Sequence, residues 1–320
     1  MKAKIKAISQ FFPKKVLTND ELSVEFPEWN SERIESKLGI AQRYITDNSE
    51  TTSTLAIGAS QLLFKEHNID KNSIDFILLC TQSPDYLLPT TACIVQDSLG
   101  IPTTAGALDF NLGCSGYVYG LSLAKGLILG RIAKNILLIT SETYSKYIDH
   151  LDKGNRTIFG DGATATLIST EGFAEILDFE LGTDGRGAQN LIVKGGGSKH
   201  PNTPSEGCFY MNGPEIFNFT VNNIPPLINS TLLKNGLNLK DIDLTIFHQA
   251  NTFILNYLRK QLDIPKDKFY IHLKDYGNTV SSTIPLALKH AFDNKKLKGN
   301  ILLAGFGVGY SWGGCILHCK

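Results

Sequence analysis

The stretch Leu108–Leu121, which reads LDFNLGCSGYVYGL, decides how this chain folds and where its chemistry lies. An apolar, strand-like run ends at the tight turn Gly113–Gly116, and a helix-like run follows through Gly130. Cys114 therefore stands in the first turn of a predicted helix, where unpaired backbone N–H groups and the positive end of the helix dipole favour thiolate over thiol. Because the thiolate is the nucleophile, the stretch predicts a reactive cysteine; a buried structural cysteine is the alternative.

Size and charge narrow the class of protein. The chain has 320 residues, 42% of them hydrophobic, which is enough to bury a large core in two halves. Lysine plus arginine and aspartate plus glutamate both number 31, so no net charge would attract nucleic acid or an anionic membrane. The N-terminal residues lack the apolar core of a signal peptide, and no apolar run approaches a membrane span. We therefore expect a soluble, cytoplasmic protein that binds no nucleic acid and does not insert into membranes.

The cysteines follow no metal or disulfide pattern. None of the six belongs to a CxxC pair, and their spread through a chain of this size is typical of free thiols. Cys315 and Cys319 are close in sequence, but they lie in a strand-like tail that favours packing. We expect a reducing compartment and no metal site.

The two halves of the sequence repeat one pattern. Residues 74–80, IDFILLC, resemble residues 242–248, IDLTIFH, and residues 135–140, NILLIT, resemble residues 300–305, NILLAG. These short apolar runs predict strands buried on both faces, and helix-like segments between them predict right-handed crossovers in a layered α/β fold. We expect an internal duplication; a chance match between two α/β halves is the alternative.

The duplication divides the chain into residues 1–172 and 173–320 and has a chemical consequence. Alignment of the halves puts Cys114 opposite Asn278, and the last residue of the first repeated strand opposite His248. All three side chains follow strand ends, where sites gather in α/β sheets. We therefore expect them to share one site.

Each of these polar groups also has a plainer interpretation. His248 closes an apolar strand; in its neutral form it donates one hydrogen bond, and it could instead be an ordinary satisfied polar group. Asn278 donates without titrating, and it could also cap the helix that follows it. The turn Gly305–Gly309, GFGVG, offers backbone N–H groups to an oxyanion. A cysteine, a histidine and an asparagine suit papain-like proteolysis or thioester chemistry, and the missing CGSCW motif favours the latter.

The chain resembles the β-ketoacyl-acyl carrier protein synthase III family of the thiolase fold almost from end to end. The resemblance rests on five ordered motifs: Asn111–Gly116 (NLGCSG), Phe159–Ala163 (FGDGA), His248–Asn251 (HQAN), Gly277–Thr279 (GNT) with Pro285, and Gly305–Gly309 (GFGVG) with Trp312-Gly313. It implies a five-layered αβαβα fold with two pseudo-symmetric halves.

The resemblance also implies a homodimer that catalyses a ping-pong, decarboxylative Claisen condensation without a cofactor. Cys114 would take an acyl group from acyl-CoA or another acyl thioester. His248 and Asn278 would hold the carbonyl of a malonyl thioester, with malonyl-acyl carrier protein as the expected extender. They would stabilise the enolate formed as CO₂ leaves. The backbone N–H groups of Cys114 and Val308 would form the oxyanion hole.

Three positions depart from the family pattern. Arg33 stands where many members carry a tryptophan that stacks on the CoA adenine; an arginine can also stack or bind phosphate. Phe253 stands where an arginine often contacts the carrier protein. Leu88 replaces a phenylalanine that often limits primer size, which favours a longer acyl chain. The resemblance places further substrate contacts at Arg156, Gly305 and Phe306.

Two other functions stay open at this point. The chain could pass the acyl group from Cys114 to an alcohol or amine without decarboxylation, because one fold supports many functions. It could also be a catalytically silent partner subunit, although such a subunit needs no thiol at a helix start. The sequence names neither the acyl primer nor the pathway; the departures at Arg33 and Phe253 favour a specialised route over housekeeping fatty-acid synthesis.

Overall fold

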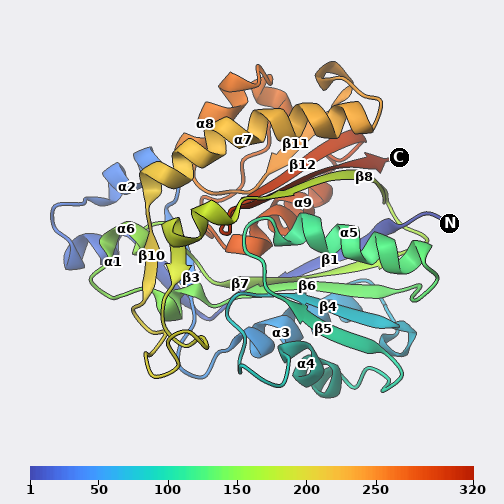
Figure 1. The fold of residues 1–320 in the computed structure, drawn as a ribbon, viewed down its shortest axis with the longest axis horizontal. Helices are drawn as coiled ribbons and strands as arrows, with labels where there is room; N and C mark the ends of the chain where they lie inside the picture. The colour runs from blue at the N-terminus through green and yellow to red at the C-terminus, as the bar shows by residue number, and fades with distance from the viewer.

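Two similar sets of strands and helices build the protein, which is described here for residues 1–320 from a computed structural model (Figure 1). The first set comprises β1 (Lys4–Phe11), α3 (Thr52–Glu66), β4 (Phe76–Cys80), α4 (Thr91–Leu99), β5 (Gly106–Phe110), α5 (Gly116–Leu129), β6 (Ile136–Glu142) and β7 (Gly162–Ser169). The second comprises β8 (Ala174–Thr183), α7 (Gly213–Lys234), β11 (Leu244–Phe247), α8 (Thr252–Gln261), α9 (Thr283–Asp293), β12 (Gly299–Gly307) and β13 (Ser311–Cys319).

All these strands join one sheet in the order β11-β12-β13-β8-β1-β7-β6-β4-β5. In each half a parallel pair, β4 with β6 or β11 with β12, is followed by an antiparallel strand, β7 or β13. In the second half the place of β5 is taken by a single parallel bridge between Thr245 and Phe269 instead of a strand. The turn between β7 and β8 contains the predicted boundary at residue 172, which stays a prediction.

The strand register repeats along with the strand order. Phe76 pairs with Ile136 in the first half, and Leu244 pairs with Ile301 in the second. These four residues occupy equivalent places in the repeated segments IDFILLC, NILLIT, IDLTIFH and NILLAG. The predicted duplication is therefore confirmed down to the residue, and a chance match between the halves is ruled out.

One hydrogen bond fixes this register in both halves. The Asp75 carboxylate accepts from the backbone N–H of Asn135 at 2.9 Å, and the Asp243 carboxylate accepts from that of Asn300 at 2.9 Å. A one-residue slip would turn every buried side chain of the strand to the other face. The aspartate that follows the isoleucine in each repeated strand thus locks the parallel pair at its start.

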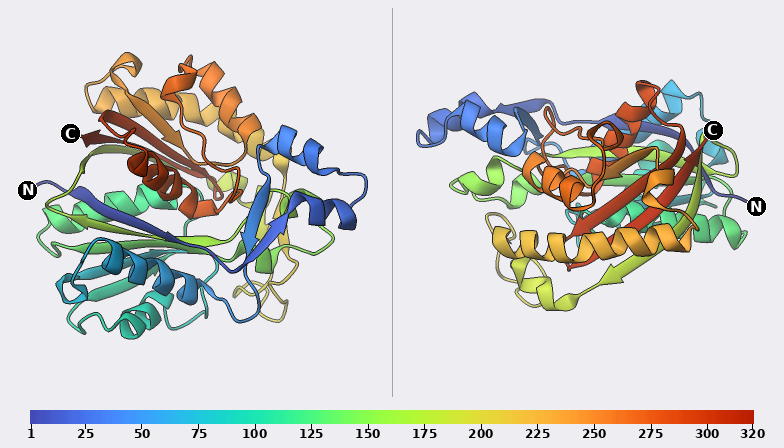
Figure 2. Two further views of the ribbon diagram at one scale, coloured as in Figure 1. Left: turned by 180° about the vertical axis from the view of Figure 1, so that it is seen from behind. Right: turned by 90° about the horizontal axis from the view of Figure 1, so that it is seen from above.

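The two portions of the sheet, with helices between them and on both outer faces, form the predicted five layers (Figures 1 and 2). Helices α3 and α4 cover one face of the β1-β7-β6-β4-β5 portion and share a buried core with it. Helices α5 and α9 lie in the middle and pack against strands from both halves in the largest core, while α7 and α8 cover the other outer face. Because both faces of every central strand are covered, these strands are apolar without alternation.

The remaining elements gather at the end of the molecule opposite the two termini (Figures 1 and 2). They are β2 (Lys15–Thr18), α1 (Asn19–Glu25), α2 (Ser31–Leu38), β3 (Gln42–Ile45), α6 (Lys153–Arg156), β9 (Leu191–Val193) and β10 (Phe209–Met211). Short 3-10 helices occupy Lys71–Ser73, Tyr144–Tyr147, Gly185–Asn190, Leu239–Asp241, Lys266–Lys268 and Val280–Ser282.

The carboxyl ends of β4, β5, β6, β11 and β12 point to the end of the molecule opposite the two termini. None of the helices combines the length and apolarity needed to cross a bilayer.

Two glycine substitutions test how tightly the halves meet. A Cβ on Gly305 of β12 would lie 2.7 Å from the carbonyl oxygen of Cys114, so Gly305→Ala forces backbone apart and should lower the free energy of unfolding by about 1–3 kcal/mol. A Cβ on Gly126 of α5 would meet no atom within 4 Å, so Gly126→Ala should raise it by about 0.5–1 kcal/mol. Urea denaturation measures both; equal effects of the two substitutions would contradict the close approach.

Candidate active site

Cys114 lies in the tight turn between β5 and α5. The hydroxyl of Ser115, the residue before the helix, lies 2.7 Å from that of Ser311 at the start of β13. The end of β12, which belongs to the other half of the chain, packs against this turn. A Cβ added to Gly305 would lie 2.7 Å from the Cys114 carbonyl oxygen, and one added to Gly307 would lie 3.2 Å from its sulfur. Glycines at both positions therefore let the β12 main chain approach the thiol closely.

One cavity of about 350 Å³ brings the three predicted polar side chains together. Cys114 lines it from the turn after β5, His248 from the residue after β11, and Asn278 from the turn before α9. Eleven of the 18 lining residues are hydrophobic, Phe306 among them. The site therefore combines one thiol with two side-chain hydrogen-bond donors in mainly apolar surroundings.

His248 is buried and fixed on several sides. Its backbone N–H donates to the Ala304 carbonyl at 2.8 Å, and its ring packs edge-to-face on Phe306 at 5.7 Å between centroids. Its Nδ1 atom lies 2.7 Å from the hydroxyl oxygen of Thr283. Burial lowers the pKa of His248 to about 3. The ring is therefore neutral at physiological pH and donates from only one nitrogen.

The Thr283 hydroxyl determines which nitrogen carries the proton. This hydroxyl also donates to the Val280 carbonyl oxygen at 3.1 Å. When the threonine proton turns to Nδ1 of His248 instead, Nδ1 is the acceptor and the ring proton lies on Nε2, which makes no hydrogen bond within the protein. In that tautomer the Nε2–H group is available to a ligand.

Asn278 is held by its backbone and by its side-chain oxygen. Its backbone N–H donates to the Ile158 carbonyl at 2.8 Å, and its own carbonyl accepts from Gly160 at 3.0 Å. The start of the FGDGA motif and the residue before it therefore hold the GNT turn in place. The Oδ1 atom accepts from the N–H of Val280 at 2.9 Å. The Nδ2 amide makes no hydrogen bond within the protein. The prediction that Asn278 caps the following helix is wrong, because Thr279 precedes the 3-10 helix, Ser282 precedes α9, and the Oδ1 contact with Val280 only closes a turn. The Nδ2 amide is available to a ligand.

Two backbone N–H groups beside the thiol also lack a partner. Neither Cys114 nor Val308 donates its backbone N–H to another residue. Val308 follows β12, and its side chain packs on the turn: a Cβ on Gly113 would lie 2.6 Å from it. Two unpaired donors on facing segments can stabilise an oxyanion.

The predicted preference for thiolate in the resting protein is wrong. Burial raises the pKa of the Cys114 thiol well above its ordinary value, and the negative charge of Glu142 acts in the same direction. The positive end of the α5 dipole favours the thiolate, but the desolvation of a sulfur enclosed by both halves outweighs this effect. Cys114 therefore rests as a thiol.

Glu142, which the sequence reasoning missed, ends β6 inside the protein. Burial raises the pKa of its carboxyl to about 8. The carboxyl accepts from the backbone N–H of Gln82 at 3.0 Å, from the Ser83 hydroxyl at 3.1 Å and from the Ser281 hydroxyl at 2.8 Å. The sequence signal that could have revealed this buried carboxyl is a glutamate at the carboxyl end of a strand that begins with four apolar residues.

Two of the other predicted contacts reach the cavity. Phe253 of α8 and Phe306 of β12 line it, and Phe253 is 61% exposed at the same time, with its ring tilted against that of Phe217 at 5.6 Å between centroids. Gly305 lies behind the Cys114 turn and acts by close packing.

Three predicted contacts lie outside this cavity. Arg33 is exposed on α2. Arg156 pairs with the Glu25 carboxylate and donates to the His150 carbonyl at 2.6 Å. Leu88 is 82% exposed on the loop before α4. Their roles as substrate contacts stay predictions.

Comparisons with known proteins agree with the geometry. The family model described as 3-oxoacyl-[acyl-carrier-protein] synthase III matches residues 108–185, and the model of its C-terminal part matches residues 232–319. The β-ketoacyl-[acyl-carrier-protein] synthase III of Clostridium perfringens is 39% identical over 98% of each chain. A crystal structure of 3-oxoacyl-(acyl-carrier-protein) synthase III superposes with a TM-score of 0.96 at 46% identity, covering 99% of this chain and all of that one. The enzyme of that name from Pseudomonas aeruginosa gives a TM-score of 0.91 at 30% identity, covering 100% and 99% of the two chains.

The charge of Glu142 is open to a direct test. Glu142→Gln removes the negative charge that raises the Cys114 pKa, so the midpoint of the pH–rate profile for alkylation of Cys114 by iodoacetamide should fall. The effect should be largest above pH 8, where Glu142 is ionised. The exposed Cys93 in the same chain is the internal reference. An unchanged or higher midpoint at Cys114 would show that Glu142 does not act on the thiol.

Proposed function

The chain belongs to the 3-oxoacyl-[acyl-carrier-protein] synthase III family, and we propose that Cys114, His248 and Asn278 carry out its condensation of two acyl thioesters. The protein is then an acyltransferase that extends an acyl group with a malonyl unit carried by acyl carrier protein. One observation carries the assignment. A thiol and two neutral side-chain donors from both halves line one mainly apolar cavity, and two unpaired backbone N–H groups lie on the segments that pack together at the thiol.

The first half-reaction transfers the acyl group to sulfur. The Cys114 sulfur attacks the carbonyl carbon of the incoming thioester, and the resulting oxyanion accepts from the N–H groups of Cys114 and Val308. The carbon–sulfur bond to the donor then breaks, and the thiol proton goes to the departing thiolate. Loss of one donor of this kind typically costs about 10²–10³ in turnover. A buried thiol with a raised pKa fits this net exchange of one thiol for another.

The second half-reaction makes the carbon–carbon bond. The Nε2–H of His248 and the Nδ2 amide of Asn278 donate to the thioester carbonyl of the malonyl group. The bond to the carboxylate breaks, CO₂ leaves, and the electron pair enters the enolate that these two donors stabilise. The carbanion attacks the acyl carbon on Cys114, and the sulfur departs as thiolate and recovers a proton.

The surroundings of the donors favour loss of CO₂. A carboxylate in a cavity lined mainly by hydrophobic residues loses hydration, whereas neutral CO₂ does not. Because burial lowers the pKa of His248 to about 3, no imidazolium is present to pair with the carboxylate and hold it. Both effects destabilise the malonyl group relative to the enolate and CO₂.

We also propose that two copies of the chain associate through the loop before α4. Tyr86, Leu87 and Leu88 are consecutive and 62%, 84% and 82% exposed. Large apolar side chains in such a row are typical of a contact surface. A second copy of this chain would cover them. Carrier protein would approach α8, where Phe253 is exposed beside the cavity and Lys260 follows on the same helix.

Separation of the half-reactions tests the assigned roles. Cys114→Ala should abolish the acyl adduct that intact-protein mass spectrometry detects in the wild type, because the nucleophile is gone. His248→Ala and Asn278→Ala should keep adduct formation and lose CO₂ release from malonyl thioester by about 10²-fold or more. Acylation of a different cysteine, or equal loss of both half-reactions in the donor variants, would refute the assignment. Acyl transfer to an alcohol or amine with no CO₂ release would favour the simpler acyltransferase.

Thr283 provides a finer test of the tautomer. Thr283→Val keeps the shape but removes the hydroxyl that donates to Nδ1 of His248, so malonyl decarboxylation should fall by about tenfold while acylation of Cys114 stays unchanged. Thr283→Ser keeps the hydroxyl and should restore the rate. Equal decarboxylation rates in the valine and serine variants would show that the hydroxyl does not orient the histidine.

A further inference from the structure

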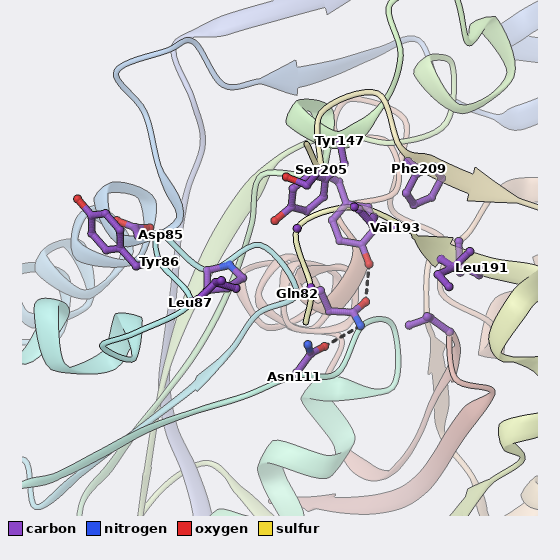
Figure 3. A pocket seen from close by; sticks show the side chains of 17 residues that line it. Gln82, Asp85, Tyr86, Leu87, Asn111, Tyr147, Leu191, Val193, Ser205 and Phe209 are labelled. Carbon is purple, nitrogen blue, oxygen red and sulfur yellow. Dashed lines mark hydrogen bonds between the residues drawn. The ribbon is translucent and has the colours of Figure 1, made fainter. Parts of the chain in front are cut away.

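A second cavity, of about 570 Å³, is lined by Gln82, Asn111, Leu191 and other residues (Figure 3). Leu191 also lines the cavity that contains Cys114, and Val308, which follows β12, lines the second one. A Cβ on Gly113 would lie 2.5 Å from the side-chain oxygen of Gln82. The Gln82 amide therefore lies against the residue that precedes Cys114, where the cavity begins.

A row of three hydrogen-bonded side chains crosses this part of the cavity (Figure 3). The Tyr144 hydroxyl donates to Oε1 of Gln82, and Nε2 of Gln82 donates to Oδ1 of Asn111 at 2.9 Å. The three residues follow the ends of β6, β4 and β5, which are neighbours in the sheet. We call Gln82, Asn111 and Tyr144 the polar row.

Aromatic packing fixes the polar row in place. The Tyr144 ring packs on Phe159 at 5.7 Å and edge-to-face on Phe209 at 5.6 Å between centroids. Phe159 and Phe209, with Cys114 and Leu191, belong to the same buried cluster as Tyr144. The tyrosine is therefore held in the same buried cluster as Cys114.

The polar row has hydrogen-bonding capacity left over. Gln82 Nε2 has a second N–H, the Asn111 Nδ2 amide has two, and the Tyr144 oxygen still has acceptor capacity. Neither Asn111 Nδ2 nor the hydroxyl of Tyr147, which also lines the cavity, bonds to another residue. An alkyl chain laid on these groups would remove their water and replace none of its hydrogen bonds.

We propose that, where the acyl group on Cys114 extends into this cavity, the polar row selects chains that bear a hydroxyl or carbonyl oxygen over alkyl groups of the same shape. This inference rests on the proposed function. A chain oxygen would occupy the place of water on Gln82 or Asn111. A site built to hydrogen-bond a substrate oxygen discriminates strongly against the analogue that lacks it.

Matched pairs of acyl donors provide the test. In 3-hydroxybutyryl-CoA and isovaleryl-CoA a hydroxyl and a methyl group exchange places on one carbon, and 4-hydroxybutyryl-CoA and pentanoyl-CoA differ in the same way one carbon further out. Intact-protein mass spectrometry of the full chain measures the rate at which each acylates Cys114. We expect the hydroxylated member of at least one pair to react about tenfold faster or more.

Variants locate the source of the preference. Gln82→Leu removes the amide and leaves a branched apolar side chain one atom shorter, and Tyr144→Phe removes one hydroxyl; both should bring the ratio close to one and speed up the alkyl donor. Tyr210→Phe, which removes a half-exposed hydroxyl on β10 outside the cavity lining, is the matched control and should leave the ratio unchanged. Circular dichroism and urea denaturation verify that each variant is folded.

Two results would overturn the selection by the polar row. One is equal rates within both donor pairs in the wild type, which is decisive even if the variants do not fold. The other is a preference that survives unchanged in Gln82→Leu. Failure of the proposed function gives a different result: no donor, acetyl-CoA included, leaves an acyl group on Cys114, and the inference then falls with it.

Discussion

The approach of β12 to the turn that carries Cys114 is the constraint on which the site depends. The two halves of the chain contribute different chemistry, the thiol from one and the histidine and asparagine from the other. These groups share a cavity only because Gly305 and Gly307 let the β12 main chain rest against the turn. The same contact brings the unpaired N–H of Val308 to the thiol side of the cavity.

Burial determines how the site can work. It keeps the histidine neutral, the thiol protonated and the Glu142 carboxyl poised near neutral pH. Such a site holds hydrogen-bond donors in place without any charge of their own. Neutral donors stabilise an enolate oxygen without binding the malonyl carboxylate, which suits a reaction that must release that carboxylate as CO₂. The second cavity, which shares Leu191 with the first, is more polar.

The fold could be predicted from the sequence because its signals are local and repeated. Each strand and the Cys114 turn is a run of a few residues, and the repeat supplied the pairing between strands that are distant in sequence. Glu142 and Thr283 were missed because their partners are set by tertiary packing. The thiol pKa was mispredicted because the helix end is visible in sequence and desolvation is not. The exposure of Leu88 likewise depends on side-chain direction.

A crystal structure of the protein after reaction with acetyl-CoA would show whether Cys114 carries the acyl group and whether the two backbone N–H groups hold its oxygen. We expect an acetyl group on Sγ of Cys114, with its carbonyl oxygen within about 3 Å of the N–H groups of Cys114 and Val308. His248 Nε2 and Asn278 Nδ2 would remain free and directed at the open part of the cavity. An acetyl group on another cysteine, or a carbonyl oxygen turned away from both N–H groups, would contradict this expectation.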